Sequence, residues 1–279
     1  MRVGFNPRLQ PFRRMSVAEQ LQETLHTGQR LEFAVVEVSV DEVLYRKGLW
    51  DTFTQDVLKI ITHAPLQFQL NIFADEGFEE APSDVTPIPR SVYLRRLVQT
   101  IEFFEAYAPM SLYVVHAGRR KRQIDDHLQA LYEAFQALQV LFPGVPLAIE
   151  NGGRESVLHF PDDFLTFLDA FPSLRFVMHT GRAFQSVMWD NEQLARYVRK
   201  ASRFVDRLAA IRWTNANPVT DPDRPLQLEL DRAPDFPLIM QGLGRNPALV
   251  HLLDAVGGRP AALARERRAL HAQVNRWTV

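Results

Sequence analysis

Cysteine is absent from the 279 residues of this sequence. Disulfide bonds, thiolate metal ligands and a cysteine nucleophile are therefore excluded. Any bound metal ion would need histidine, carboxylate, amide or water ligands.

Long hydrophobic runs are also absent. No run reaches the about 18 apolar residues that identify a membrane-spanning helix. The first residues, MRVGFNPRL, have no extended apolar core of the kind found in secretory signals. We therefore expect a soluble cytoplasmic protein without a membrane partner.

An excess of either charge is missing as well. The chain has 32 basic and 33 acidic residues, for a formal net charge of -1. Such a balance gives no general attraction to nucleic acid. A small-molecule substrate is the expected partner, and the oligomeric state is left open.

Short apolar runs alternate along the chain with segments of helical period, and 46% of the residues are hydrophobic. Runs of this kind are typical of buried parallel strands. Repeated βα units predict an α/β fold, a (β/α)8 TIM barrel formed as a single domain over residues 1–279. The eight predicted strands are Arg2–Asn6, Leu31–Val40, Leu66–Ala74, Ser111–His116, Val145–Glu150, Leu174–His179, Leu208–Thr214 and Pro237–Gln241.

Two proline-containing segments interrupt this alternation. Asp75–Pro89 follows the third predicted strand, and Asn215–Pro237 follows the seventh. Loops that follow strands emerge at the carboxyl-terminal end of such a barrel, so both should lie there. After the eighth predicted strand, helices are expected from Asn246 to about Val256 and from Pro260 to Trp277.

Three consecutive predicted strands end in polar side chains that can do chemistry. They are His116, Glu150 and His179. Because side chains alternate along a strand, all three can point into the barrel, at strand spacings of about 5 Å. Two imidazoles and a carboxylate could bind one divalent ion. Each could equally be a hydrogen-bonded structural residue.

The same stretches contain three short motifs. Val114–Gly118 reads VVHAG, Ile149–Asn151 reads IEN and His179–Ala183 reads HTGRA. These resemble the ends of strands four, five and six in a known family, the xylose isomerase-like TIM barrels. The family includes sugar-phosphate isomerases and epimerases and the endonuclease IV type of nuclease.

The sequence also departs from the family's metal-ligand pattern. The resemblance implies an aspartate where His179 stands and a histidine where Arg182 stands. A strand-seven histidine has no counterpart in the run containing Arg212, and the predicted strand eight offers Gln241 in place of a glutamate. Asn71 stands where the nuclease branch has a histidine. Of the usual ligands, Glu150 remains.

Three arrangements are compatible with these residues. A rebuilt site could bind Zn, Mn or Mg through His116, Glu150 and His179. Alternatively, Arg182 and Arg212 could bind a phosphate or carboxylate. In the third arrangement, these arginines pair with Glu150 or Glu37 and only hold the strand ends together.

The resemblance implies an isomerase- or epimerase-like enzyme for a small polyhydroxylated or phosphorylated substrate. Glu150 would be its base or metal ligand, assisted by His116 and His179. The alternatives are a non-catalytic or metal-free barrel that binds an anionic ligand or a protein, and, with less support, an endonuclease IV-like phosphodiesterase. The candidate substrate-binding residues are Arg182, Arg212, Asn71, Asn215, Gln241 and Glu37.

Overall fold

Eight parallel strands form a closed barrel in the computed structural model. The structure describes residues 1–7, 9, 15–40, 48–72, 91–118, 124–154, 156–217, 220–225, 234–244, 246, 248–254 and 260–277. The strand order is β6-β5-β4-β3-β2-β1-β9-β7, and pairing of β6 with β7 closes the sheet. The strands are β1 (Arg2–Asn6), β2 (Val35–Val40), β3 (Gln67–Ile72), β4 (Tyr113–His116), β5 (Leu147–Glu150), β6 (Arg175–His179), β7 (Leu208–Asn217) and β9 (Val250–Asp254).

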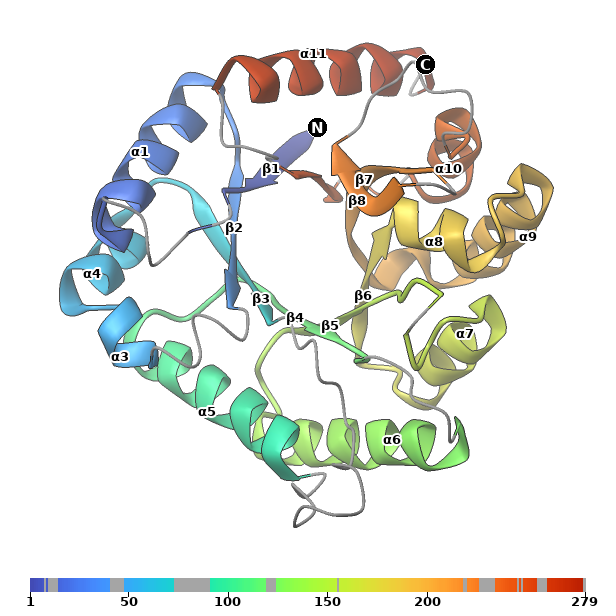
Figure 1. Ribbon diagram of the computed structural model, residues 1–279, viewed down its shortest axis with the longest axis horizontal. Coiled ribbons are helices and arrows are strands. Elements are labelled where there is room, and N and C mark those ends of the chain that lie inside the picture. The colour runs from blue at the N-terminus through green and yellow to red at the C-terminus, as the bar shows by residue number, and fades with distance from the viewer. Residues whose placement is uncertain are drawn as a thin grey trace.

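Helices surround the strands as an outer layer (Figure 1). None of the helices in the described ranges is long and apolar enough to cross a membrane. The helices are α1 (Val17–Arg30), α3 (Leu49–Thr52), α4 (Gln55–His63), α5 (Ser91–Tyr107), α6 (Ile124–Leu141), α7 (Pro161–Ala170), α8 (Thr180–Ser186), α9 (Asn191–Ala201), the 3-10 helix η1 (Ser202–Arg207), α10 (Phe236–Leu243) and α11 (Pro260–Trp277).

Local sequence explains where some helices begin. Ser16 caps α1 by accepting from the Glu19 backbone N–H at 3.2 Å, and the Glu19 side chain accepts from the Ser16 backbone N–H at 2.7 Å. This is the capping box that the sequence predicts. Asp190 caps α9 in a similar way, by accepting from the backbone N–H groups of Glu192 and Gln193.

The prediction for the eighth strand was wrong. Pro237–Gln241 lies inside α10, and the true eighth strand is β9, in the segment where a helix was expected. A five-residue apolar run fits a buried strand or a buried helix equally well. The deciding signals are Asp235, whose side chain accepts from the Leu238 backbone N–H at 3.2 Å, and a proline in the first turn.

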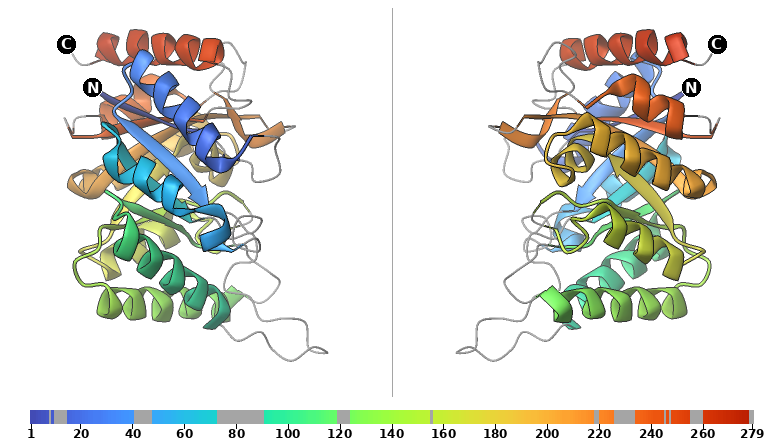
Figure 2. Two further views of the ribbon diagram at one scale, coloured as in Figure 1. Left: turned by 90° about the vertical axis from the view of Figure 1, so that its left-hand side faces the viewer. Right: turned by 90° about the vertical axis from the view of Figure 1, so that its right-hand side faces the viewer.

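The segment after the seventh strand forms a hairpin. β8 (Thr220–Pro225) pairs antiparallel with the part of β7 that extends beyond Thr214. The hairpin lies at the carboxyl-terminal end of the barrel, on the side opposite the N-terminus (Figure 2). This agrees with the expectation for Asn215–Pro237, although residues 218–219 and 226–233 lie outside the described residues. The Asp75–Pro89 segment lies entirely outside them, and a single domain over 1–279 stays a prediction.

Side-chain alternation divides the core into two parts. Outward-facing residues of the strands pack against the helices in one large cluster. Inward-facing residues fill the barrel with a smaller apolar cluster: Val35, Leu112, Val114, Ala148, Val177, Ala210, Val250 and Leu252. This apolar layer separates the two ends of the barrel.

Gly4 shows how tightly that layer is packed. A Cβ atom at this position would lie 2.8 Å from Leu252 Cδ2 and 2.9 Å from Val35 Cβ. Carbon atoms this close would overlap, and the close-packed interior leaves the neighbours little room to move. Glycine therefore allows β1 to sit between its two neighbours.

Candidate functional site

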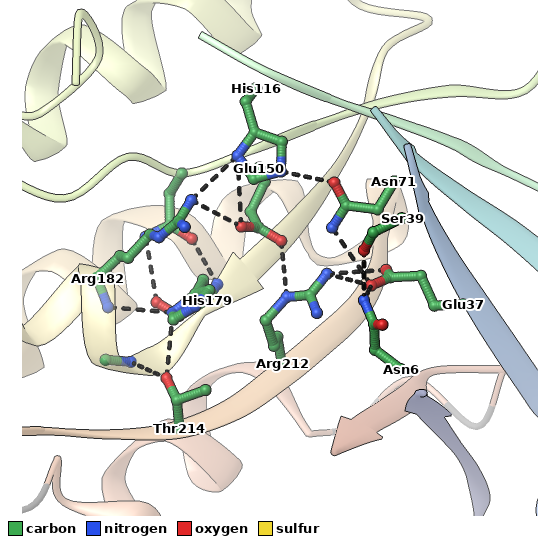
Figure 3. A network of polar contacts seen from close by, with 12 residues as sticks. Asn6, Glu37, Ser39, Asn71, His116, Glu150, His179, Arg182, Arg212 and Thr214 are labelled. Atoms are coloured by element: carbon green, nitrogen blue, oxygen red, sulfur yellow. Dashed lines mark hydrogen bonds and ion pairs between the residues drawn. The ribbon is translucent and has the colours of Figure 1, made fainter. Parts of the chain in front are cut away.

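The carboxyl-terminal ends of the strands bring a group of polar side chains together inside the barrel (Figure 3). His116 and Glu150 are direct neighbours in register on β4 and β5, and His179 is in register with Arg212 on β6 and β7. All four are buried. The structure therefore brings together the three strand-end residues singled out in the sequence, and it adds Arg212 from the next strand.

Arg212 is the central cation of this group. Its Nη2 donates to both carboxylate oxygens of Glu37, at 2.7 and 2.8 Å, and its Nε donates to Glu150 Oε2 at 2.9 Å. The side chains of Arg212 and Glu37 are 4% and 0% exposed. Removal of one partner from such a buried pair leaves a charge without compensation, which makes each partner necessary to the other.

Arg182 is the outer cation. Its Nη1 donates to Glu150 Oε1 at 3.1 Å and lies 3.0 Å from His116 Nδ1. Its side chain is 14% exposed, against 1% for Glu150. Arg182 is carried by α8, directly after β6, and so is better placed than Arg212 to meet an incoming molecule.

His116 is held in one tautomer by its neighbours. Its Nε2 lies 2.7 Å from Asn71 Oδ1, an acceptor, while Asn71 Nδ2 donates to Glu37 Oε1 at 3.3 Å. The ring proton is therefore on Nε2, and Nδ1 accepts from Arg182. Burial lowers the pKa of His116 to about 3; Glu150 opposes this, and Arg182 and Arg212 reinforce it. The ring is neutral at physiological pH.

Glu150 is ionised in spite of its burial. Burial by itself raises the pKa of a carboxyl group. Here the positive charges of Arg212 and Arg182, whose guanidinium groups donate to its two oxygens, outweigh burial and hold the pKa of Glu150 at about 2. In this arrangement Glu150 is a stable anion and a weak base.

His179 has a structural task at the junction of β6 and α8. Its Nδ1 accepts from the Arg182 backbone N–H at 3.2 Å, so that it caps the helix, and it lies 3.2 Å from Thr214 Oγ1. Asn151 accepts from the His179 backbone N–H and donates to its carbonyl oxygen at 3.2 Å. These contacts fix the segment that carries Arg182.

Two predicted site residues are not brought into this group. Gln241 is exposed on α10, because its segment is a helix and not the eighth strand. Its expected position at the end of the eighth strand was therefore wrong. The backbone of Asn215 lies in β7, paired with Arg224 of β8, while its side chain lies outside what the structure describes.

Other residues of the group were missed from the sequence. Asn6 donates to Glu37 Oε1 at 2.9 Å and to Ser39 Oγ at 2.6 Å, and Thr214 lies beside His179. Each is an inward position at a strand end, so strict two-residue alternation could have identified them. Correct placement of the eighth strand also puts Asp254 at its end, in register with Asn6.

The described donors do not fit a divalent metal ion. Both oxygens of Glu150 accept from guanidinium groups, and both ring nitrogens of His116 have hydrogen-bond partners. His179 Nδ1 also has partners. A cation at Glu150 would have to displace two arginines. Among the described residues, no group of three His, Cys, Asp or Glu side chains is arranged to hold a metal.

Comparison with solved structures places this architecture among known barrels. The chain superimposes on IolI, whose crystal structure contains a zinc atom, with a TM-score of 0.68, 13% identity and 99% of each chain covered. It superimposes on the probable 3-DHS dehydratase AsbF from Bacillus anthracis with a TM-score of 0.67, 10% identity, and 97% of this chain and 99% of AsbF covered. The fold is that of the xylose isomerase-like TIM barrels.

A xylose isomerase domain protein from Planctomyces limnophilus extends this agreement. Its TM-score is 0.62 at 13% identity, with 99% of this chain and 97% of that chain covered. The sequence matches no protein-family model and no curated protein sequence. At identities this low, the superpositions show a shared xylose isomerase-like fold alone. The chemistry depends on the side chains.

Proposed function

We propose that this protein is an isomerase- or epimerase-like enzyme that uses a guanidinium group where related barrels use a metal ion. Its substrate would be a small polyhydroxylated molecule that carries a phosphate or carboxylate. The observation that carries the proposal is the position of Arg212 between Glu37 and Glu150. A fixed cation in a buried site can stabilise negative charge that develops on a substrate carbonyl oxygen.

Arg182 would bind the anionic group of the substrate. It is the more exposed of the two arginines, and its Nη1 is shared between Glu150 and His116. A guanidinium pairs well with phosphate and carboxylate groups. Movement of Arg182 toward the substrate would release Glu150 Oε1 and His116 Nδ1 together.

The same movement would turn Glu150 into a base. Loss of one nearby positive charge raises the pKa of a carboxylate. Glu150 could then accept a proton from the carbon next to the substrate carbonyl and return it to the same or the neighbouring carbon. His116 could exchange a proton with the substrate oxygen through Nδ1. Glu37 and Asn71 act here as positioning residues, because they hold Arg212 and His116.

Proton exchange tests this proposal without knowledge of the product. The protein would be incubated in D2O with a panel of ketoses, ketose phosphates and keto acids, and NMR would detect deuterium at the carbon next to the carbonyl. We expect exchange with at least one anionic member, and its loss in Arg182→Gln and Glu150→Gln. Arg196→Gln on the exposed face of α9 serves as the control. Exchange that survives in Glu150→Gln would contradict the proposed role of Glu150.

A second candidate is a barrel that binds an anionic ligand without transforming it. The low pKa of Glu150 favours this candidate, because a carboxylate held by two guanidiniums is a weak base. Binding of a panel member that depends on Arg182, with no deuterium exchange, would support it. The endonuclease alternative gains no support from the described residues, since they hold no cluster of metal donors.

A further inference from the structure

A polar cavity lies at the amino-terminal end of the barrel, opposite the Glu150 group. Its volume is about 590 Å³, and it is lined by the amino-terminal ends of β1, β3, β6, β7 and β9 and by the segments that lead into β4, β7 and β9. Ligand sites of small molecules commonly have volumes of about 300–1,000 Å³. In barrels of this fold, chemistry belongs to the carboxyl-terminal end, so a cavity here is a separate feature.

The apolar layer inside the barrel forms the base of this cavity. Leu112 and Val250 belong both to that layer and to the cavity lining. Because the layer is buried and tightly packed, a molecule in the cavity would not reach the Glu150 group. The two ends of the barrel can therefore be tested independently.

Gln69 contributes a buried hydrogen-bond acceptor without a donor to this cavity. It faces inward on β3, is 5% exposed and lines the cavity. Its Oε1 is buried and accepts no hydrogen bond within the described part of the chain. A buried acceptor in this state costs free energy unless a donor reaches it. A hydroxyl or amide of a bound molecule would supply that donor.

The rim of the cavity carries positive charge. Arg2 donates to Gln67, and this contact holds its guanidinium at the cavity. Arg175, the first residue of β6, is exposed, and in the described structure it has no hydrogen bond or ion pair. One acidic residue, Asp206, also lines the cavity. Two arginines and one aspartate leave a positive balance that favours an anionic ligand.

We propose that this cavity is a binding site for a small molecule that carries one phosphate or carboxylate and at least one hydroxyl group. Arg175 and Arg2 contact the anionic group, and Gln69 Oε1 accepts from the hydroxyl. Asp206 can accept from a further hydroxyl. The site does not depend on the function proposed for the carboxyl-terminal end.

Calorimetric titration with two probes tests the site. Glycerol 3-phosphate and glycerate both carry a hydroxyl group and differ in the anion, so that they distinguish a phosphate site from a carboxylate site. We expect at least one to bind the wild-type protein and Arg175→Gln to weaken this binding about tenfold, since a charge-assisted contact is lost. Arg196→Gln, which removes an exposed arginine elsewhere, should leave binding unchanged.

Gln69→Leu gives a readout that a purely structural residue would not give. The variant removes a buried acceptor without a partner, so the melting temperature of the ligand-free protein should rise while probe binding weakens.

Failure of both probes to bind the wild-type protein would overturn the proposal. Binding that is lost in Arg182→Gln and retained in Arg175→Gln would overturn it as well, since it would place the probe at the other end. Equal losses in Arg175→Gln and Arg196→Gln would indicate nonspecific attraction and would also overturn it.

Discussion

Replacement of Glu150 by glutamine should destabilise the protein strongly in metal-free buffer. The substitution keeps the side-chain size and removes the anion that Arg182 and Arg212 share. Arg212 keeps its two contacts with Glu37, and Arg182 can turn partly to solvent. The loss should therefore fall at the lower end of the range for a broken buried pair, at about 3 kcal/mol.

The pKa of Glu150 leads to a similar magnitude. A shift from the ordinary value of 4.5 to about 2 corresponds to roughly 3 kcal/mol of stability above pH 5. Because the folded-state pKa is the lower one, this contribution is present at neutral pH and is lost as pH falls from 4.5 toward 2. The difference between wild type and variant should shrink over that interval.

Thermal denaturation with chelator present measures this effect. For a chain of this length we expect the melting temperature to fall by about 5–10 °C. Glu23→Gln, at an exposed position of α1, is a matched control and should change little. A loss below about 1 kcal/mol, the level of an exposed ion pair, would refute the reasoning. So would a protein that zinc stabilises in the wild type but not in the variant.

Three further outcomes are expected. Added Zn²⁺ or EDTA should leave the melting temperature unchanged, because the described donors at the carboxyl-terminal end are already paired. Burial lowers the pKa of His116 to about 3 and that of His251 to about 4. The free energy of unfolding should therefore fall as pH drops below 6.5, because the histidines of the unfolded chain gain protons there. Urea denaturation of His251→Gln should show a shallower dependence of this free energy on pH. Gly4→Ala should cost about 1–3 kcal/mol in the same assay, because its Cβ would overlap Leu252 and Val35.

Seven of the eight parallel strands could be predicted from the sequence because each is an apolar run bounded by clear helix signals. The eighth was missed, although Asp235 and Pro237 mark the start of a helix there. Pro237–Gln241 and Val250–Asp254 are both short apolar runs, and burial makes a helix and a strand look alike at this length. Because Pro237–Gln241 was taken as the eighth strand, Gln241 was placed at a strand end that it does not occupy.

The position of the polar group could be predicted from the sequence, but not which of its side chains contact one another. Strand ends of a parallel barrel meet at one end, which places His116, Glu150 and His179 together. The selection of Arg212 as central cation depends on side-chain directions across the barrel, between residues far apart in the sequence. Local patterns carry no information on such contacts, so both a metal and a guanidinium fitted the sequence.

The contact between Arg212 and Glu37 also has a consequence for how the chain folds. The two residues are separated by 175 positions in the sequence, and they join β7 to β2 across the barrel. Contacts of such high sequence separation form late, because the entropy of closing a long loop must be overcome first. Until β7 joins the sheet, Glu37 and Glu150 lack the guanidinium group of Arg212, and their carboxylates are more stable in water than in an apolar interior. The interior of the barrel should therefore stay hydrated through most of folding and dry in the final closing step.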